Sequence, residues 1–248
     1  VNLTAGNAVI KDNESTPVTY QTDLISNIEN VIATSGNDRI VMASGNTLNT
    51  INGKDGIDTI SYENYSSKVT VSLGLNTEQI VVANSTDKDT ILNIENLTGG
   101  SAGDELTGND GVNILIGRDG SDTIIGKAGN DTFVATGIND GNDLLDGGND
   151  SDTVDYSAIT DTTYYADVNL ATGNALVKNS SLATLQTDIL SGIENIIGTS
   201  GNDTFIGDGF NNTFDGRNGS DTVSFENVTD SNVSVTIDLK NNSASQLF

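Results

Sequence analysis

Residues 99–134 read GGSAGDELT, GNDGVNILI, GRDGSDTII and GKAGNDTFV, which are four nine-residue units that follow one another without a gap. Each unit begins with glycine, carries Asp or Asn at its sixth position and has an apolar residue at its eighth. A period of nine fits neither the helical period of 3.6 nor the alternation of a half-buried strand. It predicts a six-residue turn followed by a three-residue strand with one inward side chain, and glycines supply the positive φ angles of such a turn.

The same register extends on both sides of this stretch. Three extra residues (135–137) precede two more units at 138–146 and 147–155, and the register also fits 189–224 and, with a short insertion, 24–61. Fifteen units result, and the eighth position is apolar in all of them, so we expect these side chains to form the core. They are Val31, Ile40, Ile51, Ile60, Leu97, Leu106, Leu115, Ile124, Phe133, Leu145, Val154, Ile196, Phe205, Phe214 and Val223.

The sixth position is acidic in twelve units and Asn in the other three (Asn49, Asn113 and Asn212). The whole chain has 35 acidic and 10 basic residues, for a net charge of −25 over 248 residues. So high a charge normally favours disorder, because too little apolar surface is buried to offset chain entropy. A cation is therefore the expected partner, whereas nucleic acid and anionic membrane suit this surface poorly.

A longer repeat is superimposed on the nonapeptides. The segment 22–30 (TDLISNIEN) recurs as 187–195 (TDILSGIEN), and 91–96 (ILNIEN) is a shorter relative. This predicts three tandem modules over 1–73, 74–167 and 168–248, with nonapeptides at 24–61, at 90–134 and 138–155, and at 189–224. No linker separates them and the single proline is Pro17, so we expect one continuous solenoid. Strand segments near Val1 and at 233–239 would be its open ends, able to stack on another copy.

These units resemble the RTX family of hemolysin-type calcium-binding repeats, whose signature is Gly-Gly-x-Gly-x-Asp-x-U-x. The second glycine is mostly replaced here, by Lys54, Arg118, Lys127 and Arg217 among others. The resemblance implies an all-β fold, a right-handed parallel β-roll (a β-solenoid) with little or no helix. Two nonapeptides make one coil, so that turns n and n+2 stack with a Ca²⁺ ion between them.

In the family, the upper turn supplies the carbonyls of positions two and four and its Asp, and the lower turn supplies the carbonyls of positions one and three and its Asp. Six oxygens of this kind suit Ca²⁺ better than Mg²⁺, which retains water and requires strict octahedral geometry. Carried over, the clearest sites comprise Thr34, Gly36 and Asp38 with Gly53, Asp55 and Asp58; Gly100, Ala102 and Asp104 with Gly117, Asp119 and Asp122; and Thr199, Gly201 and Asp203 with Gly216, Asn218 and Asp221. Further sites in the middle block involve Asn109, Gly111 and Asn113 with Gly126, Ala128 and Asp131, and also Asp143, Gly147, Asn149 and Asp152.

The other edge is expected to bind calcium weakly or not at all, because each pair there has only one formal charge. The stacked pairs are Glu29 with Asn49, Glu95 with Asn113, and Glu194 with Asn212. The Ile-Glu-Asn triplets could provide metal ligands, but capping of loop backbone groups is the preferred interpretation. The aromatic residues Tyr62, Tyr156 and Phe225 could stack on sugars, but we expect them to plug the roll where nonapeptides stop.

The sequence favours a structural function. It has no His and no Cys, so a catalytic triad, a thiol nucleophile and a zinc site are not expected. No stretch approaches the length of a membrane span. We therefore expect a calcium-binding, secreted or surface-located bacterial repeat region of an S-layer protein, adhesin or filament subunit, which folds on several Ca²⁺ ions after type I secretion. The alternative is the C-terminal secretion and folding module of an RTX toxin or of a secreted protease, lipase or epimerase.

Overall fold

The computed structural model describes residues 7–11, 19–24, 28–44, 49–83 and 86–227. All regular elements in these ranges are strands, so the all-β expectation is confirmed. No helix long and apolar enough to cross a membrane occurs in them. The end segments near Val1 and at 233–239, like Pro17, fall outside the described residues.

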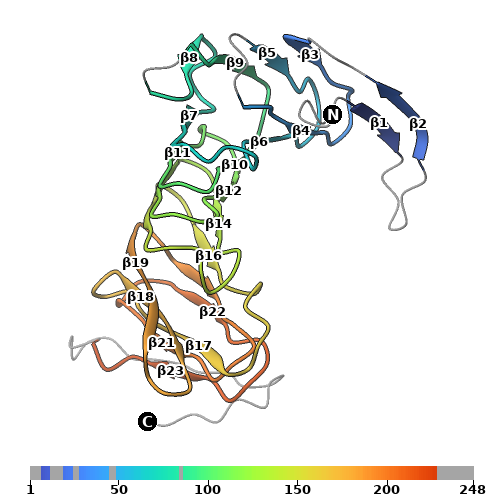
Figure 1. Ribbon diagram of the computed structural model, residues 1–248. Coiled ribbons are helices and arrows are strands. Elements are labelled where there is room, and N and C mark those ends of the chain that lie inside the picture. The colour runs from blue at the N-terminus through green and yellow to red at the C-terminus, as the bar shows by residue number, and fades with distance from the viewer. Residues whose placement is uncertain (1–6, 12–18, 25–27, 45–48, 84–85, 228–248) are drawn as a thin grey trace.

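Two long sheets form the body of the molecule (Figure 1). The first sheet has eight strands and is parallel throughout, and the second has nine strands. In spatial order the first comprises β22 (Thr213–Asp215), β20 (Asn195–Ile197), β16 (Thr153–Asp155), β14 (Thr132–Val134), β12 (Ile114–Ile116), β10 (Asn96–Thr98), β6 (Thr59–Ser61) and β4 (Arg39–Val41). The second comprises β23 (Thr222–Ser224), β21 (Thr204–Ile206), β17 (Tyr164–Asn169), β18 (Asn174–Asn179), β19 (Thr184–Ser191), β15 (Leu144–Gly148), β13 (Thr123–Lys127), β11 (Glu105–Thr107) and β7 (Thr70–Ser72).

From β10 to β16, consecutive nonapeptide strands alternate between the two sheets, whereas β3 and β5 of the first block belong to a separate four-stranded sheet. Strand β10 pairs with β12 through Leu97 and Leu115, and β11 pairs with β13 through Leu106 and Ile124. Units n and n+2 therefore lie side by side, as the resemblance implied, and the turns between them stack along the edges of the roll. Because the first sheet is unbroken from β4 to β22, it extends through all three nonapeptide blocks.

The space between the sheets is filled by the eighth-position side chains. Thirteen of the fifteen are buried, and Phe214 and Val223 near the end of the described chain are partly buried against the core. Phe205 and Phe214 stack with their ring centroids 5.4 Å apart. One inward side chain per unit cannot form a core alone, so each coil is stabilised by the coils on both sides.

The segments between nonapeptide blocks depart from a purely parallel roll. Strands β17, β18 and β19 form an antiparallel meander, whose outer members pair in parallel with β21 and β15. The same arrangement occurs earlier, where β9 (Lys88–Leu92) pairs in parallel with β5 (Asn49–Asn52) and antiparallel with β8 (Gln79–Ile80). Strand β8 is followed by Val82, which bridges to Val69 beside β7.

Each meander thus adds strands to one face only, while the other face continues directly from coil to coil. Strand β16 lies against β20 in the first sheet, whereas β17 and β18 intervene between β19 and β21 in the second. The remaining strands are β3 (Asn30–Ile32), which pairs with β5, and the antiparallel pair β1 (Asn7–Lys11) and β2 (Thr19–Leu24). Figure 1 shows the result, a column of coils that is widened by one meander and bends over at the other.

Candidate metal centres in the stacked turns

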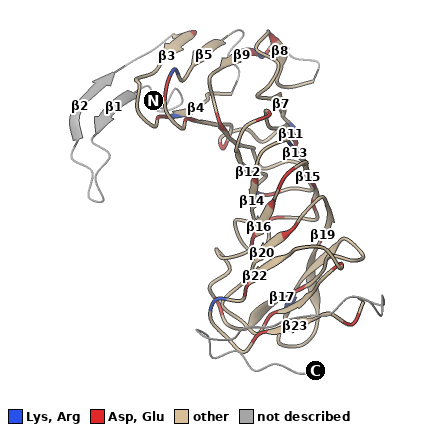
Figure 2. Ribbon diagram, turned by 180° about the vertical axis from the view of Figure 1, so that it is seen from behind, with Lys and Arg blue, Asp and Glu red and all other residues tan. Residues whose placement is uncertain are grey.

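Most sixth-position residues, together with Asp188 from the segment before the third block, form two columns, one along each edge of the roll. Backbone pairing and side-chain hydrogen bonds define their order. The first column comprises Asp38, Asp58, Glu95, Asn113, Asp131, Asp152, Glu194 and Asn212, and the second comprises Asp104, Asp122, Asp143 and Asp188, with Asp203 and Asp221 following after the meander. Figure 2, seen from behind, shows acidic positions recurring along the stacked coils.

Each column is held together by carboxylates that cap the turn above. The Asp104 backbone N–H donates to Asp122 Oδ1 at 2.6 Å, and the Asp122 N–H donates to Asp143 Oδ1 at 2.9 Å. In the first column the Asp131 N–H donates to Asp152 Oδ1 at 2.7 Å. One oxygen of each such carboxylate is therefore used within the protein, and its partner oxygen decides what else the turn can hold.

That second oxygen has no protein donor in four of these aspartates. The Oδ2 atoms of Asp58, Asp122, Asp131 and Asp152 are buried, and they accept no hydrogen bond from the described residues. A buried charged oxygen without a partner is costly, since nothing replaces the water it has lost. A cation between the turns would satisfy these atoms, so the residues present fit a metal ion.

The glycines of the turns make room for this arrangement. A Cβ at Gly117, the first position of its unit, would lie 2.1 Å from Asp122 Oδ2. Gly120, the fourth position, has φ of +132°, and a Cβ there would lie 2.7 Å from the carbonyl oxygen of Ala102 in the turn above. Glycine is required at both positions because the carboxylate and the stacked carbonyl occupy the space of a side chain.

The structure brings the predicted site residues together in pairs of stacked turns. Asp38 contacts Asp58 at 2.7 Å, Asp203 contacts Asp221 at 2.9 Å and Asn113 contacts Asp131 at 2.7 Å, in each case from backbone N–H to Oδ1. The carbonyl-bearing residues of the upper turns lie over glycines of the lower turns: Gly36 over Gly56, Ala102 over Gly120, Gly111 over Gly129 and Gly201 over Gly219. In the next coil, the Gly147 carbonyl lies against Gly126. The Asn149 N–H donates to the carbonyl of Lys127, which lies between the predicted site residues Gly126 and Ala128.

Other predicted residues have roles at the start of each stack. Thr34 donates its N–H and its hydroxyl to Asp38 Oδ2, both at 2.8 Å. Thr199 holds both oxygens of Asp203, and the N–H groups of Gly100 and Asn109 cap Asp104 and Asn113. The third-position side chains Asp55, Asp119, Asn149 and Asn218 are exposed, so only their carbonyls could contribute to a site between turns. Gly53 and Gly216 lie beneath the Oδ2 atoms of Asp58 and Asp221.

Burial also perturbs the carboxyl groups of the second column. It raises the pKa of Asp122 to about 7 and that of Asp143 to about 8, and neighbouring carboxylates add to both shifts. The raised pKa means that the charged form is disfavoured without a counter-charge. A bound dication would supply that counter-charge directly.

No group of three or more acidic side chains within the described residues is arranged as a metal centre. Each pair of stacked turns, called a level below, supplies at most two carboxylates, so backbone carbonyls must complete the coordination shell of an ion.

The model of the RTX calcium-binding nonapeptide repeat (4 copies) matches residues 98–133, 139–158 and 190–230. These segments are RTX calcium-binding nonapeptide repeats. RTX repeats bind Ca²⁺, and the second and third nonapeptide blocks are the ones matched.

No curated protein is significantly similar to the chain. The first nonapeptide block, residues 24–61, lies outside the matched segments, yet its turns have the same RTX geometry. The Asp58 carboxylate caps the Asp38 N–H just as the Asp122 carboxylate caps the Asp104 N–H, and Gly56 takes the place of Gly120.

The expectation that the Glu and Asn pairs occupy an edge separate from the Asp38–Asp58 site is wrong, because Glu95 and Asn113 continue the column that contains Asp38 and Asp58. Asn113 is buried and donates from Nδ2 to the Glu95 carbonyl at 2.7 Å. An amide N–H therefore occupies the direction in which a cation would approach that carbonyl. Glu95 and Glu194 each accept a backbone N–H through Oε2, from Asp58 and Asp152 respectively. The preferred interpretation of the Ile-Glu-Asn triplets, capping of backbone groups, is confirmed for the triplets at 94–96 and 193–195.

Sequence reasoning missed the partners of the tyrosines that close the first and second RTX blocks, whereas Phe225, which follows the third block, is only partly buried. The Tyr156 hydroxyl donates to Asp188 Oδ2 at 2.8 Å, and Asp188 also accepts from Gln186 and from the Asp143 N–H. The equivalent pair is Tyr62 and Asp89, which are 2.7 Å apart. Both tyrosines are fully buried, so they plug the roll and present no face to a sugar. Their only sequence signal is the aromatic residue that follows each block.

We expect Tyr156→Phe to lower the free energy of unfolding of the calcium-loaded protein by about 1.5–3 kcal/mol, the range for hydrogen bonds to charged groups. The ring would still fill the core, so only the hydrogen bond to Asp188 is lost. Urea unfolding at fixed free Ca²⁺ measures the change. Tyr164→Phe is the matched control, because the Tyr164 hydroxyl makes no hydrogen bond within the described residues. Equal effects of the two substitutions would contradict a specific role for the Tyr156–Asp188 pair.

Proposed function

We propose that this chain is a structural repeat region of an extracellular bacterial protein, an S-layer protein, adhesin or filament subunit, which becomes rigid when it binds Ca²⁺. The observation that carries the proposal is the set of buried, unpartnered Oδ2 atoms of Asp58, Asp122, Asp131 and Asp152. They recur along one continuous stack of coils, which is where a structural ion would join one coil to the next.

The proposed ligand sets follow the stacked turns. Asp38 and Asp58, Asp104 and Asp122, and Asp203 and Asp221 supply two carboxylates each, completed by carbonyls of the first four turn positions. Asp122 with Asp143 and Asp131 with Asp152 provide two further levels in the middle block. Levels that contain Asn113 or Asn212 would bind Ca²⁺ weakly or not at all, because ligand charge tunes calcium affinity.

The calcium requirement also gives a reason for folding outside the cell. RTX repeats are typical of bacterial proteins exported by type I secretion. With a net charge of −25, the apo chain repels itself and stays extended where free calcium is scarce. External calcium at millimolar concentration would neutralise two charges per ion and allow the strands to stack.

A scaffold is favoured over a catalyst by the lack of His and Cys in the sequence and by the use of the clustered aspartates as turn caps. The unbroken first sheet, which joins all three nonapeptide blocks, also favours an extended supporting element. The proposal assigns no reaction to this region.

The test combines location with the layout of the parent protein. We expect antibodies against this region to label intact producing cells, and EGTA to make the labelled protein sensitive to added protease. EGTA saturated with Ca²⁺ is the control, since it leaves free calcium unchanged. Labelling that appears only after lysis would contradict the proposal. A catalytic domain upstream of a single copy of this region would favour the secreted-enzyme alternative instead.

A further inference from the structure

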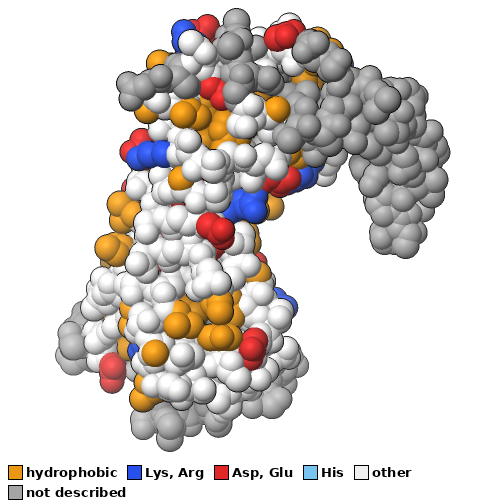
Figure 3. All heavy atoms as spheres, in the orientation of Figure 1, with side chains coloured by type: hydrophobic (Ala, Val, Ile, Leu, Met, Phe, Trp, Pro, Cys, Tyr) orange, Lys and Arg blue, Asp and Glu red, His pale blue; other side chains and the backbone are white. Residues whose placement is uncertain are grey.

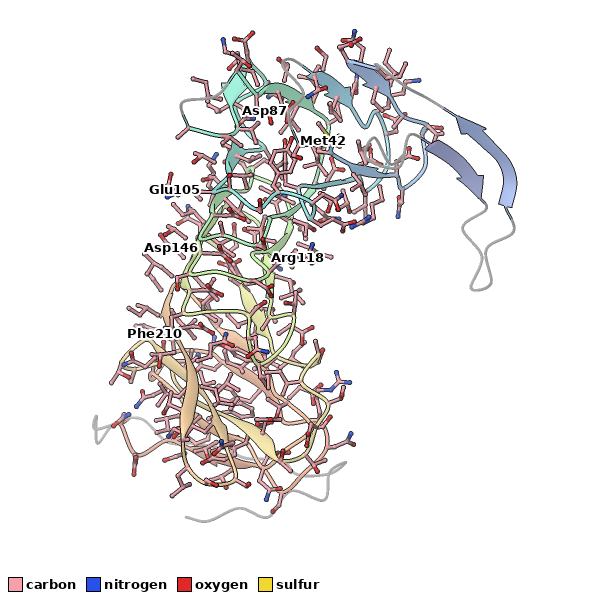
Figure 4. All side chains as sticks on the ribbon, viewed as in Figure 1. Met42, Asp87, Glu105, Arg118, Asp146 and Phe210 are labelled. Carbon is pink, nitrogen blue, oxygen red and sulfur yellow. The ribbon has the colours of Figure 1, made fainter. Side chains whose placement is uncertain are left out.

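A hollow with a mixed polar and apolar lining lies on the outer face of the first sheet and extends to the turn that contains Arg118. It has a volume of about 690 Å³ and is bordered by strands β4, β6, β10 and β12 and by the segment that follows β6. Small-molecule sites commonly have volumes of this order. Figure 3 shows basic and acidic side chains close together on the flank beneath the bend, and Figure 4 places Arg118 on that same flank.

The hollow is lined by arginine side chains, which are few in this acidic chain. The sequence has three arginines, and two of them, Arg39 and Arg118, line this one hollow. On a surface with a net charge of −25, most sites would repel an anion. Arginine also presents a planar fork of N–H donors that matches a carboxylate. The hollow is therefore suited to an anionic group.

The two arginines have different surroundings. Arg39 forms an ion pair with Glu63, whose carboxylate also accepts from Ser61, and this holds the segment after β6 against the sheet. Arg118 donates from one guanidinium nitrogen to the backbone carbonyl of Glu63 at 3.2 Å. That bond uses one of five N–H donors, and the described residues take up no other. Arg118 is thus fixed at one end with donors left for a ligand.

The backbone at Arg118 is unusual for a residue with a side chain. Its φ is +75°, in the left-handed region, at the second position of its unit, where the RTX signature has glycine. Glycine adopts this conformation without steric cost, whereas other residues do so at a penalty. Arg217 has the same position and a φ of +61° in a later unit, but it does not line the hollow.

The rest of the lining combines hydroxyl and amide groups with a larger share of apolar surface. Thr59, Thr98 and Thr136 contribute hydroxyl groups, and Asn96 contributes an amide. The Asn96 amide is fixed, because its Oδ1 accepts the Ile114 N–H at 2.8 Å. The Ile114 side chain is 43% exposed at the floor of the hollow. Such a lining suits a ligand with many hydroxyl groups and short apolar faces.

From these features we infer that the hollow binds a carboxylate-bearing oligosaccharide, with a sugar carboxylate on Arg118. Pyranose rings combine hydroxyl groups with C–H faces, and a uronic acid adds the anion. Arg118 lies between Gly117 and Asp119, in the turn that holds a proposed calcium site, so calcium orders the residue that contacts the sugar. Binding therefore requires the calcium-loaded chain.

Glycine substitution at two matched positions tests the inference. Arg118→Gly and Arg217→Gly each restore the residue of the RTX signature and relieve a positive φ, so both variants should keep or raise the thermal midpoint in Ca²⁺. The probe is an oligosaccharide of hexuronic acids, titrated calorimetrically at fixed free Ca²⁺. We expect Arg118→Gly to weaken binding by about ten- to a hundredfold, in line with loss of a charge-assisted hydrogen bond, and Arg217→Gly to leave it unchanged.

Two further ligands separate the chemistry of the site from general charge. The same oligosaccharide with its carboxyl groups reduced should bind the unaltered protein no better than it binds the Arg118→Gly variant. A sulfated neutral oligosaccharide that bound as tightly would overturn the assignment to a sugar carboxylate. Equal loss in both glycine variants would overturn it as well, because general attraction to positive charge would then account for the binding. Unchanged binding in both variants would also overturn it, because calcium bridging between the sugar and surface aspartates would then suffice. Absence of uronate binding to the calcium-loaded protein would also reject it, while leaving calcium-dependent folding intact.

Discussion

Removal of calcium with EGTA should abolish most of the β-sheet signal in far-ultraviolet circular dichroism, and added Ca²⁺ should restore it. Four buried Oδ2 atoms have no protein partner, and each costs about 1–3 kcal/mol or more when left unsatisfied. Together these costs approach the whole stability of a typical domain, which is about 5–15 kcal/mol. Repulsion among 35 acidic residues acts in the same direction.

The ion itself can be separated from simple charge screening. Mg²⁺ or NaCl at matched ionic strength should restore little structure, since the stacked carbonyls and carboxylates suit the larger and more flexible shell of Ca²⁺. The thermal midpoint should rise steadily with free Ca²⁺, because a ligand that binds only the folded state stabilises it by mass action. A full β-sheet spectrum in EGTA would show that the roll folds without the ion.

Much of the fold could be predicted from the sequence because the nonapeptide specifies its own turn. The residues that fix the turn lie within six positions of one another, as Gly117, Gly120 and Asp122 do. Once each unit forms a turn and a short strand, stacking of units n and n+2 places Leu97 beside Leu115 and Asp104 above Asp122. The turn motif and the pairing of strands therefore repeat with the same nine-residue period, so the motif predicts which strands pair.

The meanders could not be predicted in the same way. Their register depends on contacts between residues that are distant in sequence and share no motif. Asp58 is capped by Glu95, 37 residues later, and Asp188 lies beneath Asp143 across 45 residues. Asp188 lies in the recurring segment 187–195, but the repeat does not show which residues it contacts. Only the fold shows that Tyr156 and Gln186 provide its hydrogen bonds.

The contrast between local sequence and long-range contacts also applies to the two kinds of turn level, those with two Asp residues and those with Glu and Asn. The sequence shows that Asn113 has no charge, and this alone predicted a weaker level. The structure adds that its amide is directed at the Glu95 carbonyl, so a hydrogen bond stabilises this level without an ion. Some levels of the stack are therefore held by calcium and others by side-chain donors.

This difference leads to a ranking of substitutions by their effect on calcium. Asp122 is buried, has Asp104 above it and Asp143 below it, and leaves its Oδ2 free for an ion. We expect Asp122→Ala to remove at least one calcium ion from the bound total and to weaken calcium binding in the middle block by about tenfold to a thousandfold, the sensitivity expected when a charged ligand is lost. Isothermal calorimetry gives both the stoichiometry and the affinity.

Asn113→Ala and Glu95→Ala are the comparison variants. Both remove hydrogen bonds from the level at which the Asn113 amide bonds to the Glu95 carbonyl and no ion is needed. Each should lower the stability of the calcium-loaded protein by about 1 kcal/mol while leaving the number of bound ions unchanged. Asp122→Asn separates charge from shape, since it keeps an acceptor for the Asp104 N–H. It should lose calcium as Asp122→Ala does, but destabilise the stack less. Equal calcium losses for Asp122→Ala, Asn113→Ala and Glu95→Ala would show that ligand charge does not distinguish the two kinds of level.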